Sequence, residues 1–238
     1  DQLNKGDFSL EYFEEDFDTG GLFDPVFVDD ENYLRGRIDR VDMAGNLVRV
    51  IDYKTGSKAF NLKAILNGKD LQLIIYMIAV SDDKKDLEPI GAFYISLKDE
   101  LENFSYSITD EKKLEASLDK KFALDGILLD KDGKALTIMD RDSNGKRSPI
   151  VRARRNYKIS EEDFKKLKFF VKDLAKDLIK DIKAGKIKLA PLREDKNYSA
   201  CTFCDYKGIC KFDKTIDTFR FRDFDKKLTI KDLEDKND

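Results

Sequence analysis

The clearest alternation of hydrophobic and polar positions lies in two neighbouring runs of the chain. These runs, residues 33–43 and 47–54, are rich in β-forming side chains and flank the turn sequence Ala44-Gly45-Asn46. If Gly45 and Asn46 form a two-residue loop, counting outward from it places Asp39 opposite Asp52. The pattern therefore predicts an antiparallel hairpin whose register is set by its turn.

Helical periodicity predicts two longer helices. The first covers residues 62–80 and is expected to break near Asn67-Gly68. The second extends from its N-cap Ser160 to about residue 184, with Asp163 in the capping-box position. Its apolar stripe, from Phe164 to Ile182, marks the face that this helix is expected to bury.

The remaining predicted elements are shorter. Strands are expected at residues 8–13, 23–28 and 90–97, and helices at residues 111–122 and 135–142. The order of these elements predicts an α/β fold with a mixed sheet. A chain of 238 residues is long enough for one large domain with a real core.

Composition narrows the possible chemistry. The chain has no histidine, which excludes the Ser-His-Asp triad, the Cys-His dyad and every zinc site that uses histidine. Three cysteines do not make an even disulfide framework, and no signal peptide or membrane-spanning run is visible, so we expect a cytoplasmic protein. Catalysis would therefore depend on carboxylates, lysines, tyrosines, cysteines and bound ions.

The hairpin carries the strongest candidate site. Asp39, Asp52 and Lys54 are predicted to lie on one face near its open end. Two carboxylates so close repel each other unless a proton or a cation lies between them, and oxygen ligands favour Mg²⁺ or Mn²⁺. The lysine could orient a water or stabilise a charged phosphate. The alternative is an ordinary cross-strand ion pair on a solvated face, and a one-residue slip in register would scatter the set.

The chain resembles the RecB-like branch of the PD-(D/E)XK nucleases in three motifs, namely Gly-Arg-Ile-Asp39-Arg-Val-Asp, Asp52-Tyr53-Lys54-Thr-Gly and Gln72-x-x-x-Tyr76. The resemblance implies a restriction-endonuclease-like core, with a mixed β-sheet flanked by helices. It implies that Asp39, Asp52 and the Tyr53 carbonyl bind the metal and that Lys54 is the catalytic lysine. Gln72 and Tyr76 match a helix motif beside the active site, although alone they would fit an ordinary amphipathic helix.

All three cysteines lie in one short segment, Cys201-Thr-Phe-Cys204-Asp-Tyr-Lys-Gly-Ile-Cys210. Thiolates at this spacing can bind one soft metal centre, and the alternative is an apolar loop with incidental thiols. The segment resembles the C-terminal cysteine cluster of AddB-type subunits of bacterial helicase–nucleases. That resemblance implies an iron–sulfur (4Fe–4S) cluster whose fourth cysteine lies outside this chain. The absence of that cysteine, and of the helix that usually carries a histidine near the metal, is what an N-terminally truncated domain would show.

The same resemblance implies an organisation and a function. Residues 1–197 would form the truncated nuclease core, and residues 198–238 would form the cysteine-cluster loop and a tail packed on it. The function implied is that of a metal-dependent DNA exonuclease in double-strand-break repair by recombination, acting with an AddA-type helicase–nuclease subunit and without a membrane. A stand-alone RecB-type exonuclease and a catalytically idle DNA-binding scaffold are the alternatives.

Charge is distributed unevenly along the chain, although 45 Lys and Arg nearly balance 48 Asp and Glu. Residues 1–32 are strongly acidic, whereas residues 152–193 are strongly basic. Aspartates alternate with the lysines of the long predicted helix, which favours a solvated, ion-paired face over a phosphate-binding one. The better candidates for DNA contact are three arginines without an acid among them, Arg152, Arg154 and Arg155.

Overall fold

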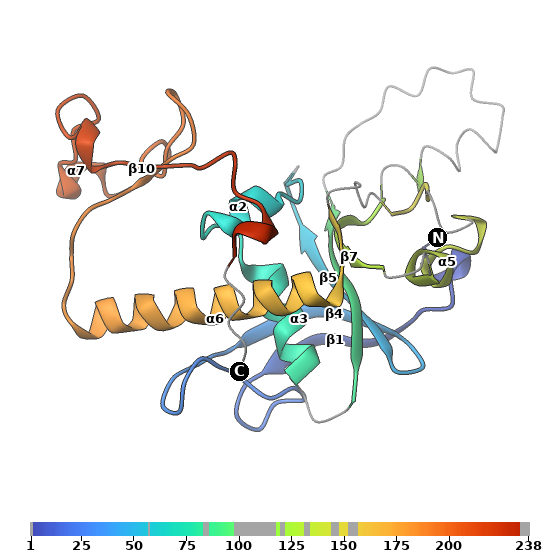
Figure 1. Ribbon diagram of the computed structural model, residues 1–238. Coiled ribbons are helices and arrows are strands. Elements are labelled where there is room, and N and C mark those ends of the chain that lie inside the picture. The colour runs from blue at the N-terminus through green and yellow to red at the C-terminus, as the bar shows by residue number, and fades with distance from the viewer. Residues whose placement is uncertain are drawn as a thin grey trace, which may run out of the picture.

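The computed structural model describes residues 2–56, 58–82, 86–97, 118–119, 122–130, 134–143, 148–151 and 157–233 (Figure 1). Most of the helix expected at residues 111–122 lies outside these ranges. So do the three arginines suggested for DNA contact, Arg152, Arg154 and Arg155. Within the described ranges, no helix is long and apolar enough to cross a membrane.

A six-stranded sheet forms the centre of the fold. Its strands follow the order β1 (Ser9–Phe17), β4 (Gly36–Ala44), β5 (Leu47–Lys54), β6 (Glu88–Ser96), β7 (Asp125–Leu129) and β8 (Lys158–Ile159). β5 pairs with β6, and β7 with β8, in parallel, and the other neighbours are antiparallel. The predicted α/β fold with a mixed sheet is confirmed.

Strands β4 and β5 form the predicted hairpin. Gly45 has a φ of +64°, a left-handed conformation that a hairpin turn needs and that glycine adopts without strain. Ala44 pairs with Leu47, and the register continues to Arg40 opposite Ile51. The expected register is therefore correct, and one step further outward brings Asp39 beside Asp52.

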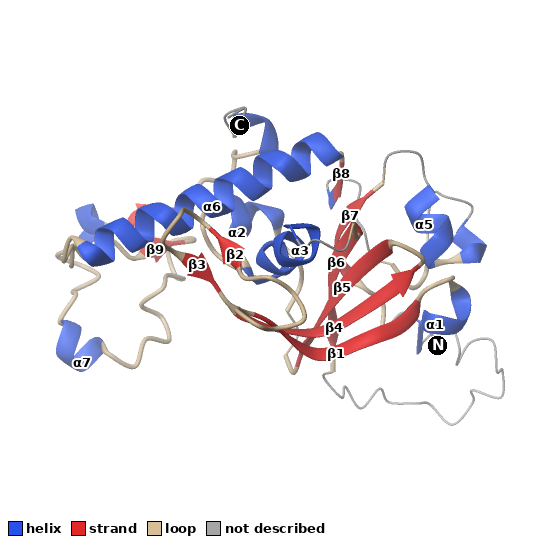
Figure 2. Ribbon diagram, turned by 90° about the horizontal axis from the view of Figure 1, so that it is seen from below, coloured by secondary structure: helices blue, strands red, loops and turns tan. Residues whose placement is uncertain are grey.

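Helices cover both faces of the sheet (Figure 2). On one face lie α2 (Leu62–Leu66), α3 (Gln72–Asp82) and α6 (Glu161–Lys183), and on the other lie α1 (Gln2–Lys5) and α5 (Lys134–Met139). Because neighbouring residues of a strand point to opposite faces, Val50 joins the first core layer and Ile51 the second. The break between α2 and α3 falls at Asn67-Gly68, as predicted.

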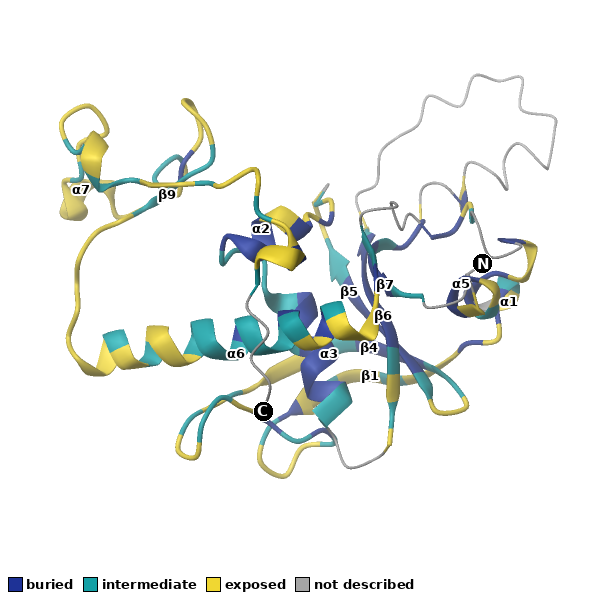
Figure 3. Cartoon of the chain, in the orientation of Figure 1, coloured by how far each residue is buried: buried dark blue, intermediate teal, exposed yellow. Residues whose placement is uncertain are grey.

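Helix α6 begins as the sequence predicts but buries less of its apolar stripe. Ser160 and Asp163 form a complete capping box at its start. Its first turns bury Phe164, Leu167 and Val171 against the sheet. The C-terminal half extends beyond the sheet, so Ile182 is 76% exposed (Figure 3). The prediction of a buried stripe is therefore wrong for that half.

The other elements are short. They are β2 (Val26–Phe27), β3 (Tyr33–Leu34), the 3₁₀ turn η1 (Arg141–Ser143), β9 (Leu192–Arg193), α7 (Lys207–Cys210), η3 (Thr218–Arg220), β10 (Arg222–Asp223) and η4 (Ile230–Asp232). The region after α6 leaves the sheet and forms a small β9–β10 unit that carries α7 (Figure 1). It then returns, and Ile230 is buried in the core layer that contains α3 and α6.

Candidate active site

The predicted site residues meet where β4 and β5 separate. The described ladder between these strands ends at Arg40 and Ile51. Beyond that pair, Asp39 Oδ2 accepts a hydrogen bond from the Tyr53 backbone N–H, with an N···O distance of 2.9 Å. The Asp39 side chain therefore replaces a backbone rung and lies beside the segment that carries Asp52.

A connected row of polar side chains extends from Asp52 to α3. Lys54 Nζ lies 2.5 Å from Asp52 Oδ2. The same ammonium donates to Gln72 Oε1 at 2.8 Å, and Gln72 Nε2 donates to the Tyr76 hydroxyl at 2.7 Å. Gln72 and Tyr76 share a helix face because they are four residues apart. The structure thus brings together all five side chains that the sequence suggested for the site.

Helix α3 is held in place by its apolar residues. Leu73, Ile74 and Met77 are fully buried against the sheet. Gln72 is the first residue of the helix and therefore lies at the end of α3 that faces Lys54. Packing of the helix thus fixes the position of the Gln72 amide relative to β5.

Burial dominates the electrostatics of the site. Asp52 is 1% exposed, and loss of hydration raises the pKa of its carboxyl above the ordinary value. Lys54 opposes this rise because it favours the ionised form, whereas the nearby Asp39 adds to it. Burial likewise raises the pKa of Tyr76, so its hydroxyl stays protonated at neutral pH. An ionised Asp52 is therefore costly unless further positive charge approaches it.

The donor set fits a divalent cation. Asp52 Oδ2 is buried and accepts no hydrogen bond from the described residues, although Lys54 lies close to it. The Lys54 carbonyl bonds to the Leu97 N–H on the β6 side, so the alternation of peptide groups along a strand turns the Tyr53 carbonyl toward β4. Two carboxylates and one carbonyl oxygen are ligands that Mg²⁺ and Mn²⁺ prefer.

These three oxygen donors do not fill a coordination sphere. In the parts of the chain that the structure describes, no group of three or more Cys, Asp or Glu side chains is arranged to hold a metal. Mg²⁺ usually keeps several waters and is bound by one or two carboxylates together with substrate phosphate, which fits such an incomplete set.

Two residues that the sequence did not single out complete the surroundings. The Tyr94 ring lies 5.3 Å from Lys54 Nζ and also 5.3 Å from Lys58 Nζ, measured to the ring centroid. Lys58 forms an ion pair with Asp70 at 2.8 Å and also favours the ionised form of Asp52. The recurrence of lysine four residues after Lys54, in the loop after β5, is the only sequence signal that could have indicated Lys58.

The three cysteines lie apart from this site. Cys201, Cys204 and Cys210 are free thiols and line one cavity of about 300 Å³. Large apolar side chains around them are exposed, with Phe203 at 79% and Ile209 at 83%. The thiols thus share a cavity without forming a closed set of metal ligands in the described residues.

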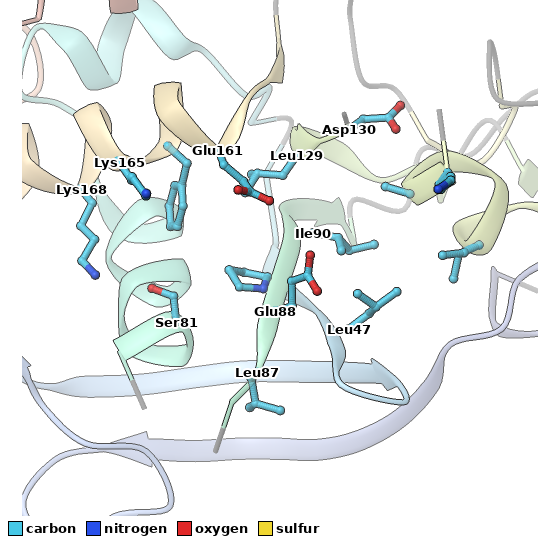
Figure 4. A pocket seen from close by; sticks show the side chains of 15 residues that line it. Leu47, Ser81, Leu87, Glu88, Ile90, Leu129, Asp130, Glu161, Lys165 and Lys168 are labelled. Carbon is cyan, nitrogen blue, oxygen red and sulfur yellow. The ribbon is translucent and has the colours of Figure 1, made fainter. Parts of the chain in front are cut away.

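A further cavity of about 490 Å³ is also remote from the catalytic side chains. It lies where β6 begins, between the first turns of α6 and the end of β7, with Glu88, Glu161, Lys165 and Lys168 at its edge (Figure 4). Asp52 and Lys54 are near the opposite end of the parallel β5–β6 pair, because Glu88 pairs with Leu47 whereas Tyr94 pairs with Asp52. This cavity therefore takes no part in the candidate site.

The mixed sheet, with Asp39 on one strand and Asp52-x-Lys54 at the end of the next, has the arrangement of a PD-(D/E)XK-type nuclease. The PD-(D/E)XK nuclease superfamily matches residues 1–211, and the chain belongs to this superfamily. Its members generally use a divalent metal ion.

Similar proteins include the B-type subunit of the ATP-dependent helicase/deoxyribonuclease of Alkaliphilus metalliredigens, which is 34% identical over 91% of this chain and 20% of the relative. The protein of the same name from Clostridium tetani is 33% identical over 93% of this chain and 21% of the relative. That from Thermoanaerobacter sp. is 36% identical over 79% of this chain and 18% of the relative. The chain thus spans about a fifth of the length of these relatives.

Proposed function

We propose that this chain is the nuclease domain of an AddB-type protein and hydrolyses phosphodiester bonds of DNA with Mg²⁺ or Mn²⁺. The observation that carries the proposal is the buried Asp52 carboxylate, which lies beside Asp39 and the Tyr53 peptide and has an oxygen without a hydrogen bond. The named relatives support a DNA substrate, an AddA-type partner and a role in processing broken DNA ends.

Each polar side chain has a distinct role in this proposal. Asp39, Asp52 and the Tyr53 carbonyl would hold the metal, which when bound polarises the phosphate and lowers the pKa of a bound water. Lys54 holds a positive charge next to Asp52, where it can orient the attacking water or stabilise charge on the phosphate. Gln72 fixes the lysine by accepting one of its protons, and Tyr76 fixes the Gln72 amide.

The direct test is DNA cleavage by the intact protein with its AddA-type partner, in the presence of Mg²⁺. We expect Asp52→Asn to abolish cleavage assigned to this domain. Asp82→Asn is the control, because Asp82 is also an acid paired with lysines but belongs to the far end of α3. Cleavage by Asp52→Asn at the wild-type rate would refute the assignment and favour a catalytically idle scaffold.

We further propose that Cys201, Cys204 and Cys210 provide three of the four ligands of a 4Fe–4S cluster. The support is that all three thiols line one cavity, which suits soft thiolate chemistry. The fourth ligand would come from protein outside these 238 residues, and residues 198–238 would then be a unit that the cluster joins to the core. The intact protein, purified without oxygen, should be brown and contain four irons. Stoichiometric zinc without iron would refute this assignment.

A further inference from the structure

A buried charged cluster lies on the face of the β4–β5 hairpin opposite the metal ligands. Asp42 is fully buried and accepts two hydrogen bonds from Arg40, Nε to Oδ1 at 2.6 Å and Nη2 to Oδ2 at 2.8 Å. Arg49 donates to the same carboxylate at 2.9 Å and is itself fully buried, with its guanidinium 4.6 Å from the centroid of the Phe8 ring. One carboxylate thus joins two guanidinium groups inside the protein.

The cluster extends to Tyr53. Arg40 Nη1 donates to the Tyr53 hydroxyl at 3.1 Å. The Tyr53 ring packs against the core layer on this side of the sheet, and its backbone N–H bonds to Asp39 on the other strand. Tyr53 is therefore fixed to β4 twice, by its N–H through Asp39 and by its hydroxyl through Arg40. Both contacts lie beyond the last described backbone pair of the two strands, Arg40 with Ile51.

Stability alone does not explain such a cluster. Desolvating three charged groups costs several kcal/mol each, and well-packed apolar residues often stabilise a fold as well or better. Arg49 Nη1 also has no hydrogen-bond partner in the described structure, which adds to the cost. Rigid bidentate geometry fixes positions more precisely than apolar packing does. The position that this cluster fixes is that of the Tyr53 peptide.

We propose that Arg40 and the Tyr53 hydroxyl are positioning groups that hold the Tyr53 peptide in register with Asp39 and so preorganise the metal site. The inference rests on the function proposed above, because it assigns the Tyr53 carbonyl to the metal. Outer contacts that orient metal ligands typically change metal affinity about 10–100-fold when they are removed.

Tyr53→Phe is the test, since it removes one hydroxyl and keeps the ring in the core. In the intact protein we expect Mn²⁺ binding, measured by calorimetry, to weaken about tenfold. In the metal-free protein, amide hydrogen exchange of a peptide covering residues 49–56 should become faster. Tyr33→Phe removes a hydroxyl from the exposed strand β3 and is the matched control, for which neither quantity should change.

Arg40→Lys gives an independent check. It keeps the positive charge but cannot make the bidentate contact with Asp42 and reach the Tyr53 hydroxyl, so it should behave like Tyr53→Phe. If both variants bind Mn²⁺ as the wild type does, with unchanged exchange, the positioning role is refuted. If Asp52→Asn still abolishes Mn²⁺ binding in that case, the proposed nuclease site stands. Wild-type protein that binds no Mn²⁺ would overturn both.

Discussion

Replacing Asp52 by Asn should stabilise the protein without metal and yet abolish stabilisation by metal. The carboxyl is 1% exposed and its pKa is raised, mainly by burial, so its charge destabilises the folded state at neutral pH. Each unit of such a rise corresponds to about 1.4 kcal/mol. Asn keeps the shape and removes the charge. We therefore expect a gain of about 1 kcal/mol, or roughly 2–4 °C in Tm for a chain of this size.

Metal should reverse this order of stability. At a concentration of Mg²⁺ or Mn²⁺ of about 100 times Kd, binding stabilises the wild type by about 2.7 kcal/mol. The variant lacks a principal ligand and should gain almost nothing. Thermal unfolding of both proteins, in EDTA and in excess metal, should therefore show the variant as the more stable protein without metal and the less stable one with it.

The effect should also depend on pH in a defined direction. Asp52 is penalised only when ionised, so the advantage of Asn is complete above the raised pKa. It fades as pH falls toward 3.8, the ordinary carboxyl value. Asp82 is the control of opposite sign, because Lys168 and Lys172 lower its pKa despite burial. Asp82→Asn should lower Tm at neutral pH and leave the metal increment unchanged.

Two outcomes would refute these expectations. A metal-free Asp52→Asn protein that melts below the wild type would mean that the ion pair with Lys54 outweighs the cost of burying the carboxylate. A variant with the full wild-type metal increment would mean that Asp52 is not a ligand.

Three further predictions concern neighbouring contacts. Lys54→Ala should lower kcat for DNA cleavage by about 10²-fold, with a much smaller effect on Mn²⁺ affinity in calorimetry because lysine is not a ligand. Gln72→Leu should lower kcat less than Lys54→Ala does, since it releases the ammonium without removing it; an equal loss would contradict a supporting role. Gly126→Ala should destabilise the fold by about 1–3 kcal/mol in urea unfolding, because its Cβ would collide with the Ala92 carbonyl oxygen, whereas Gly56→Ala has open space and should be neutral.

The local part of the fold was predictable from the sequence. A two-residue turn fixes the register of a hairpin by itself, which is why the pairing of Ala44 with Leu47 followed from the turn sequence. The capping box of α6 and the break between α2 and α3 are also local signals. The grouping of Asp39, Asp52 and Lys54 followed because strand periodicity and the hairpin register together set which side chains share a face.

Contacts between distant segments were not predictable. Strand β7 was missed because its five residues include Gly126, which weakens the strand pattern and is explained only by the close approach of the β6 backbone. The exposure of Ile182 depends on where the sheet ends and not on the periodicity of α6.

The sequence by itself determined the identity of the site's side chains and their order along two strands and a helix. Only the tertiary structure decided that Gln72 meets Lys54, that Asp52 loses its water, and that Arg40, Asp42 and Arg49 are buried beneath the site. The physical reason is that burial and cross-element distances depend on how helices cover both faces of the sheet. A pattern within one segment does not contain that packing.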